Sequence, residues 1–142
     1  MHGHFSISVE RPRDLVRIAM GGLFGAGDIA AFVEARRVAH AELGCGPNQH
    51  LTLNDLREMK IQSQETVAAF QALLADPAYR SRRLAFVIPQ TLTRNQAMRA
   101  LAGRDCRCFD TPEEAEAWLL DEGYVEQSEP WAIPERRTAA GR

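Results

Sequence analysis

The sequence predicts an α/β fold: one domain built on a mixed, mostly parallel sheet of four or five strands. Apolar and polar residues alternate over residues 4–9, as in a half-buried strand. An uninterrupted apolar run over residues 84–88 indicates a strand that is covered on both faces. Helix-starting and helix-ending residues separate these strands along the chain. The 142 residues suffice for a single core that needs no disulfide or metal.

Two strands are expected first, over residues 4–9 and 15–20. Phe5, Ile7 and Val9 share one face of the first strand. The turn at residues 11–13 contains Pro12 and is short, so we expect the two strands to pair antiparallel.

A helix is expected next, over residues 28–43. Asp28 is placed to cap its first turn, and Gly44 to end it in a left-handed conformation. A third strand over residues 51–53 is expected to end at the polar pair Asn54 and Asp55.

The second half alternates helices with strands. A helix is expected between the capping residue Ser63 and Asp76-Pro77, then the strand over 84–88, a helix over 93–102 and a strand over 106–109. The last helix opens at Thr111-Pro112, with a capping hydroxyl and a proline in the first turn. The order β-β-α-β-α-β-α-β-α predicts parallel strands joined by right-handed crossovers, with the first strand added antiparallel.

Composition excludes several classes of protein. Seventeen basic and 19 acidic residues give a net charge of −2, which argues against a nucleic-acid partner. No apolar stretch is long enough for a membrane span, so no integral membrane contact is expected. The N-terminus lacks the features of a signal peptide, which predicts a cytoplasmic protein. Cys106 and Cys108 lack the spacing of zinc or redox motifs, so we expect apolar core cysteines and neither metal nor cofactor.

The chain changes character near residue 121. Residues 1–121 carry the predicted domain, and residues 122–142 form a tail that contains proline and glutamate. Its aromatic residues suggest packing against the domain or a partner, including a second copy in a homodimer; a mobile end is the alternative.

The order of elements, the acidic end of the third strand and the segment over residues 109–119 together resemble the bacterial SpoIIAA-like proteins. These belong to a group that unites STAS domains with CRAL-TRIO lipid-binding domains. The resemblance covers about residues 4–121. It implies a small non-enzymatic binding domain with helices mainly on one face of the sheet, and it names no ligand.

The resemblance also points to a phosphorylation site. In phospho-regulated STAS domains the third strand ends in Asp-Leu-Ser, and a regulated serine begins the next helix. Here Asp55 and Leu56 match, whereas Arg57 replaces the first serine. Ser63 lies at or one residue before the regulated position, which Gln64 occupies in the second alignment. Arg57 and Lys60 nearby would favour a phosphate there; the simpler interpretation makes Ser63 only a helix cap.

Two further features are weighed as ligand sites. Residues 25–30 fit the Gly-x-Gly-x-x-Gly/Ala pattern of dinucleotide-binding proteins, but Asp28 would place a carboxylate where the pyrophosphate binds, so turn glycines explain the pattern better. Arg36 and His40 lie one helical turn apart at the edge of the apolar stripe, where they can meet an anionic ligand. The alternative is that the Arg36 stem covers apolar surface and its head reaches water.

Sixteen of the 17 basic residues are arginines, a count that genome bias explains. Most of them are expected in turns and on outer helix faces: Arg11, Arg13, Arg80, Arg82, Arg83, Arg136 and Arg137. Arg36 and Arg57 remain as candidates for an anion site.

We therefore expect a binding module for a regulatory protein partner or a small apolar or anionic ligand. The residues expected to bind it are Gly25, Asp28, Arg36, Asp55, Arg57, Lys60, Ser63 and Gln64. One alternative is a lipid carrier resembling CRAL-TRIO domains, which needs an apolar cavity between sheet and helices. A second is an anti-sigma-factor antagonist regulated through Ser63. An enzyme would need a buried pair of titratable groups in a cleft, and the sequence shows no motif for one.

Overall fold

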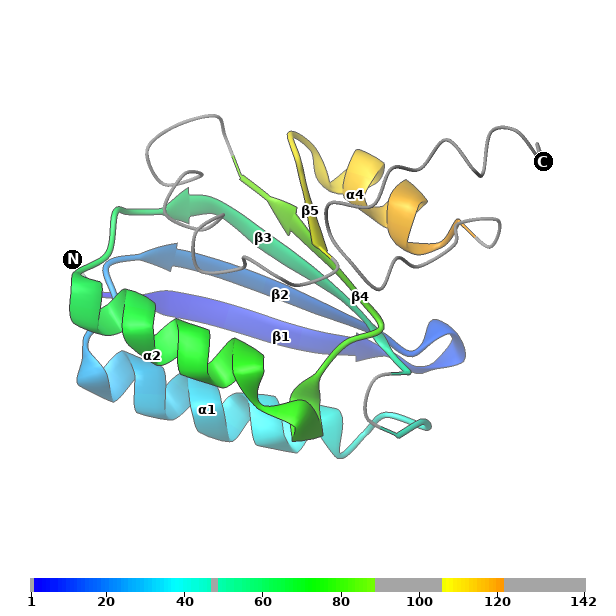
Figure 1. Cartoon of the computed structure of the whole chain (residues 1–142), viewed down its shortest axis with the longest axis horizontal. Coiled ribbons are helices and arrows are strands. Elements are labelled where there is room, and N and C mark those ends of the chain that lie inside the picture. Colours follow the sequence, from blue (N-terminus) through cyan, green and yellow to red (C-terminus); the bar gives the residue numbers. More distant parts are fainter. Residues whose placement is uncertain (1, 47–48, 89–105, 122–142) are drawn as a thin grey trace.

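The computed structural model describes residues 2–46, 49–88 and 106–121. Figure 1 shows a twisted sheet with helices packed against it. The strands are β1 (His4–Glu10), β2 (Leu15–Gly22), β3 (Leu51–Met59), β4 (Arg83–Val87) and β5 (Cys106–Phe109). The helices are α1 (Ala26–His40), α2 (Gln64–Ala75) and α4 (Pro112–Leu119), with short 3-10 turns η1 (Arg11–Arg13) and η2 (Pro77–Tyr79). The expected helix over 93–102 and the tail over 122–142 lie outside the described residues.

The five strands are arranged in the order β1-β2-β3-β4-β5. β1 pairs antiparallel with β2, and each following pair is parallel. The predicted fold class, a mixed and mostly parallel sheet in an α/β domain, is confirmed.

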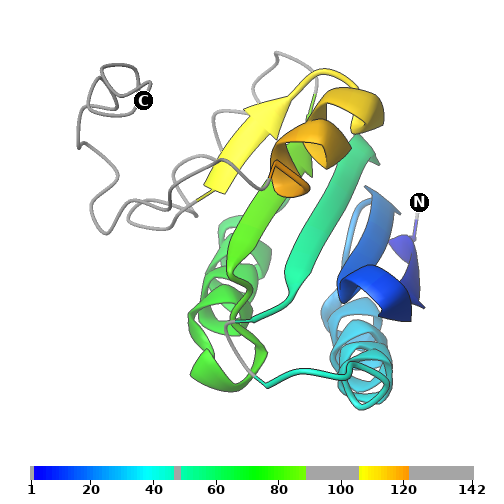
Figure 2. The ribbon, with the colours of Figure 1, turned by 90° about the vertical axis from the view of Figure 1, so that its right-hand side faces the viewer.

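The helices lie on opposite faces of the sheet (Figure 2). α1 and α2 cover one face, where Ile18, Leu84 and Phe86 belong to a core cluster that Phe32 of α1 joins. α4 covers the other face, where its Trp118 packs in a second cluster with side chains of β2, β3 and β4. Neighbouring residues of a strand point to opposite faces, so each central strand supplies both clusters.

Helix α1 begins and ends earlier than predicted. Its N-cap is Gly25, and Asp28 lies in the first turn, where its carboxylate accepts a hydrogen bond from the Gly25 amide at 2.9 Å. The predicted left-handed Gly44 is also wrong, because Gly22 is the described glycine with a positive φ. The Gly44 amide instead donates to Asp14 Oδ1 at 3.1 Å, after the helix has ended at His40.

Strand β3 is longer than predicted, since it continues through Asn54 and Asp55 to Met59. Asn54 pairs with Ile18 on one side and Phe86 on the other, which places both polar residues in the middle of the sheet. The hydrogen bonds of two neighbouring strands outweigh the poor strand propensity of Asn and Asp.

Arg83 is a further correction, because it is buried in β4 and does not lie in a turn or on an outer helix face. Its Nη1 donates to the carbonyl oxygens of Trp118, Leu119 and Asp121 at 2.9–3.0 Å. These carbonyls lie at the C-terminal end of α4, where backbone acceptors lack partners within the helix. A buried guanidinium therefore fixes this helix to the sheet.

We predict that Arg83→Met lowers the free energy of unfolding by about 2–3 kcal/mol, because it leaves three carbonyls at the end of α4 without their charged donor. Chemical denaturation followed by circular dichroism measures this change. The control, Arg37→Met, removes an exposed arginine paired with Glu34 on α1 and is expected to cost less than about 0.5 kcal/mol. Equal stability of the two variants would contradict the anchoring role of Arg83.

Candidate functional site

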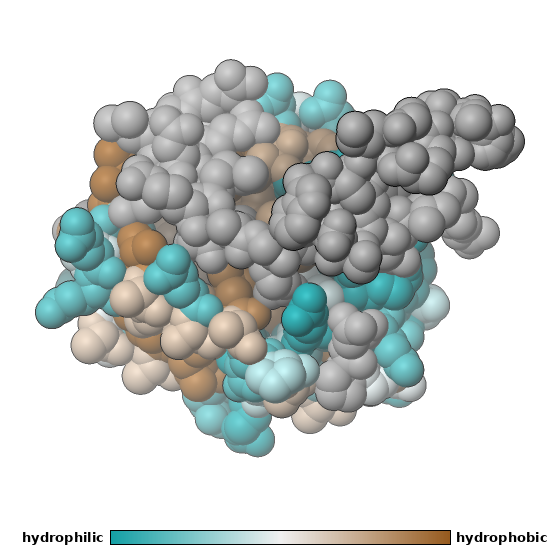
Figure 3. All heavy atoms as spheres, in the orientation of Figure 1, coloured by the Kyte–Doolittle hydropathy of each residue, from teal (hydrophilic) through white to brown (hydrophobic). Residues whose placement is uncertain are grey.

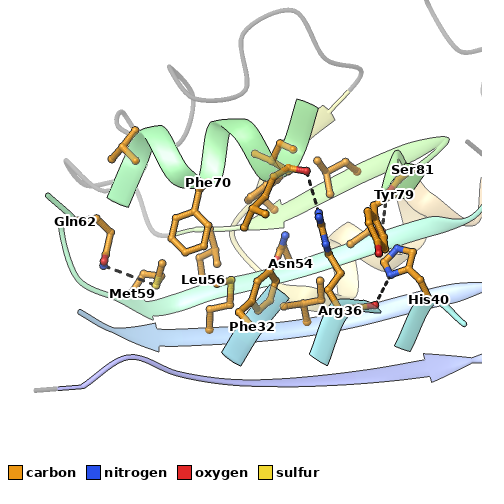
Figure 4. Close-up of a pocket in the computed structure, with 18 of the residues that line it drawn as sticks. Phe32, Arg36, His40, Asn54, Leu56, Met59, Gln62, Phe70, Tyr79 and Ser81 are labelled. Carbon is orange, nitrogen blue, oxygen red and sulfur yellow. Dashed lines mark hydrogen bonds between the residues drawn. The ribbon is translucent and has the colours of Figure 1, made fainter. Parts of the chain in front are cut away.

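A cavity of about 130 Å³ lies between the sheet and the helix pair α1 and α2. Figure 4 shows side chains from α1, α2 and β3 converging on it. Most of its wall is apolar: Ile18, Met20, Phe32, Leu56, Met59, Val67, Phe70, Leu73, Leu74, Leu84 and Phe86. Lys60, which follows the end of β3, also lines the cavity and is exposed.

Arg36 reaches from α1 across the cavity toward α2 (Figure 4). Its Nη1 donates to the carbonyl oxygen of Leu73 at 2.9 Å, and its guanidinium lies 4.0 Å from the centre of the Tyr79 ring. Only 8% of the residue is exposed, and burial lowers the pKa of its guanidinium. The predicted alternative, a head group that reaches water, is therefore wrong, because α2 and Tyr79 cover it.

The guanidinium of Arg36 has no hydrogen-bonded carboxylate among the described residues. Asp76 Oδ2 lies 4.0 Å from Nη2, beyond hydrogen-bonding distance, and its side chain is 42% exposed. Nε of Arg36 is buried and has no hydrogen-bond partner among the residues that the structure describes. Buried charges are normally paired and hydrogen-bonded, so this cation retains unused binding capacity.

Asn54 enters the cavity from β3, and Figure 4 shows its amide nitrogen directed toward the helices. The residue is 8% exposed, and within the described part of the chain its Oδ1 has no hydrogen-bond partner. Buried amides are usually hydrogen-bonded. The predicted third strand ended at this residue, so its position in the cavity wall was not foreseen.

A buried polar network adjoins the Arg36 end of the cavity. His40 Nδ1 contacts the Arg36 carbonyl oxygen at 3.1 Å, and its Nε2 lies 3.3 Å from Nε2 of His50. The same nitrogen of His50 lies 3.2 Å from Ser81 Oγ, which is 2.6 Å from Thr52 Oγ1. Burial, followed by the neighbouring His40, lowers the pKa of His50 to about 4, and burial also lowers the pKa of His40.

This network contains a serine beside a histidine, a pairing that some enzymes use for nucleophilic catalysis. A catalytic base also needs a group that orients its second nitrogen. Nδ1 of His50 is buried and has no such partner among residues 2–46, 49–88 and 106–121. The described residues therefore do not complete a catalytic triad around His50. Its members lie 10 and 31 positions apart, so no local motif could have indicated it.

Gln62 and Thr66 fix the opposite end of α2. Gln62 Oε1 accepts from the Phe24 amide at 2.9 Å, while its Nε2 donates to the Gly22 and Lys60 carbonyls. The Thr66 hydroxyl donates to the Phe24 carbonyl at 3.1 Å. These contacts join the start of α2 to the connection between β2 and α1, and thereby shape the mouth of the cavity.

The expected ligand residues at the start of α1 are engaged with each other. Besides the Gly25 amide, the Asp28 carboxylate accepts from the Gly3 amide at 3.2 Å. The Gly25 bond is the main cause of a lowered pKa of Asp28. A carboxylate therefore takes the backbone donors that a pyrophosphate would need, which argues against the dinucleotide interpretation.

Asp55 and Arg57 form an ion pair within β3. Arg57 donates from Nε to Asp55 Oδ1 at 2.9 Å and from Nη2 to Oδ2 at 2.6 Å. The side-chain bond to Arg57 lowers the pKa of Asp55. Neither residue lines the cavity that Arg36 enters, so the two arginines expected to bind anions occupy separate places.

Ser63 is the N-cap of α2, as predicted, and its hydroxyl accepts from the Thr66 amide at 3.1 Å. Ser63 and the following Gln64 are exposed. The cap accounts for the serine at this position, and phosphorylation of Ser63 stays a prediction.

Among the described residues, no helix is long and apolar enough to cross a membrane, and no three metal-ligating side chains are grouped. Cys106 and Cys108 are half-buried against the α1/α2 side of the core.

Comparison with known proteins supports the fold. The chain matches no protein-family model, and no curated protein matches it. It is similar to the crystal structure of an uncharacterized protein of the DUF3478 family with a SpoIIAA-like fold from Shewanella loihica PV-4. The sequences are 18% identical, and the match covers 82% of this chain and 94% of that chain with a TM-score of 0.64. The similarity confirms the SpoIIAA-like fold.

We predict that acidification weakens the fold through His50. The unfolded state binds a proton near pH 6.5, whereas the folded state resists it until about pH 4. The free energy of unfolding should therefore fall as the pH decreases from about 6.5 to 4, by up to about 3 kcal/mol. Denaturation at a series of pH values measures this slope.

His50→Gln is expected to flatten the slope in that range, whereas the control His4→Gln, at an exposed histidine, should leave it unchanged. A wild-type stability that is constant between pH 7 and 4.5 would contradict the prediction.

We predict that Ser63→Ala lowers the free energy of unfolding by about 1 kcal/mol, because the Thr66 amide loses its capping acceptor. Ser63→Asp should keep stability within about 0.5 kcal/mol of wild type, since aspartate is an equally good N-cap. Thermal denaturation measures both, with Ser8→Ala on exposed β1 as control. Equal losses in the Ala and Asp variants would show that the cap does not stabilise α2.

Proposed function

We propose that this protein is a binding module that holds a small, mainly apolar ligand in the cavity between the sheet and helices α1 and α2. The single observation that carries the proposal is the cavity itself, with about 130 Å³ of space behind an almost continuous apolar wall. Protein interiors are normally packed with few voids larger than a water molecule. Apolar cavities of about 150 Å³ remain dry and take up molecules such as benzene.

The surrounding contacts support a cavity that is built into the fold. Gln62 and Thr66 hold one end of α2, and Arg36 holds the other through the Leu73 carbonyl. Between these points Phe70 faces Phe24 and Phe32 at ring distances of 5.5 and 6.3 Å. In the space-filling view, apolar side chains gather over α2 and along its seam with α1 (Figure 3).

A cavity is what the lipid-carrier alternative requires, and its small volume favours a compact ligand over a long-chain lipid. Binding of a regulatory protein, control through Ser63 and formation of a homodimer stay predictions. The proposal that this protein is not an enzyme rests on His50, whose Nδ1 has no partner among the described residues to orient it as a catalytic base.

We predict that Val67→Phe blocks the cavity. Val67 lies in the first turn of α2, is half-buried and lines the cavity, so a larger ring there competes with the ligand for space. Wild-type protein is expected to bind benzyl alcohol, a neutral probe of suitable size, and the variant at least about tenfold more weakly. Isothermal titration calorimetry measures the affinity, and methyl resonances of Leu56 and Leu84 report the place of binding.

The matched control is Val33→Phe, at an exposed valine on α1 that does not line the cavity; its affinity should stay within about twofold of wild type. Absence of binding to the wild type, or undiminished binding to Val67→Phe, would reject the proposed function.

A further inference from the structure

We propose that the ligand of this cavity is a small carboxylic acid, bound as its anion, with the carboxylate at Arg36 and Asn54 and its apolar body against the aromatic wall. This inference rests on the proposed function and adds the chemical class of the ligand. It is carried by two residues, each more than nine-tenths buried, that line the cavity: Arg36, a cation whose neighbouring carboxylate lies beyond hydrogen-bonding distance, and Asn54, whose amide nitrogen is directed into the same space in Figure 4.

The charges around the cavity select for an anion. Arg36 and Lys60 both line it, and none of the described residues that line it is an aspartate or glutamate. The nearest carboxylate to Arg36, that of Asp76, is 4.0 Å away and 42% exposed. A guanidinium removed from water in this way interacts strongly with an anion that enters the same space.

Asn54 gives the anion a second donor. It projects from β3, opposite Arg36 of α1, and its amide nitrogen is directed into the cavity in Figure 4. The residues that pair with it on the two adjacent strands are Ile18 and Phe86. Their side chains are apolar and cannot accept a hydrogen bond from the Asn54 amide. A carboxylate with two oxygens can accept from the guanidinium and the amide together.

The apolar remainder of the cavity limits the rest of the ligand. Its walls include Phe32, Phe70 and Phe86, which suit an aromatic ring or a short branched chain. With about 130 Å³ available, one ring with a single carboxylate fits, whereas a long-chain fatty acid does not.

The test compares three probes of equal framework on the full chain at about pH 7: benzoate, benzyl alcohol and benzylamine. Benzoate is expected to bind at least about tenfold more tightly than benzyl alcohol, and benzylamine more weakly than both. If benzyl alcohol binds and benzoate does not exceed it, the carboxylate inference is overturned while the proposed function stands. If neither binds, the proposed function fails, and with it this inference.

Two variants and one control locate the residues that give the preference for benzoate. Arg36→Met should abolish the ratio of benzoate affinity to benzyl alcohol affinity, and Arg37→Met, at the exposed neighbour of Arg36, should retain it. Because Arg36 also holds α2, Asn54→Leu provides an independent variant, with an expected fall of about threefold to tenfold in the ratio of benzoate affinity to benzyl alcohol affinity. A benzoate preference that survives in Asn54→Leu and in folded Arg36→Met would place the anion elsewhere and overturn the assignment.

Discussion

Helix α2 is held to the molecule by polar contacts at its two ends, and the cavity exists because of this arrangement. At the start of the helix, the Thr66 hydroxyl donates to the Phe24 carbonyl, and the Gln62 side chain accepts from the Phe24 amide. At its end, the Arg36 guanidinium reaches from α1 to the Leu73 carbonyl. A long charged side chain acts here as a spacer, so the apolar middle of α2 faces the sheet without filling the space between them.

The opposite face of the sheet is organised differently. There Ala115 is fully buried and brings α4 close to β3 and β4, while Arg83 holds the end of that helix through three carbonyls. Arg17 adds an ion pair to Glu116 at 2.6 Å. One face therefore combines close packing with polar anchoring, and the other leaves a space. This asymmetry lets the sheet remain a rigid support while the α1/α2 face admits a ligand.

Local sequence signals predicted the elements well where a cap or a strict alternation marked them, as at Ser63, at Thr111 and along β1. They failed at Asn54, because a polar residue in a buried strand looks like the end of that strand. Arg36 was recognised as a possible anion-binding residue, but its burial depends on where α2 lies, and contacts between residues 37 positions apart determine this. Such long-range contacts have no signature in a single sequence.

Several residues expected to bind a ligand have hydrogen bonds that serve local structure instead. Asp28 is occupied by two backbone amides, Asp55 by Arg57, and the Ser63 hydroxyl by Thr66. These residues matched sequence patterns for ligand binding, yet their hydrogen bonds serve the turns and helix starts in which they occur. Nε of Arg36 is buried without a partner in the described part of the chain, and the neighbouring Asp76 carboxylate lies 4.0 Å from Nη2, beyond hydrogen-bonding distance. Arg36 and the amide of Asn54 line one cavity, so the recognition proposed for this protein depends on where α1, α2 and β3 bring them together.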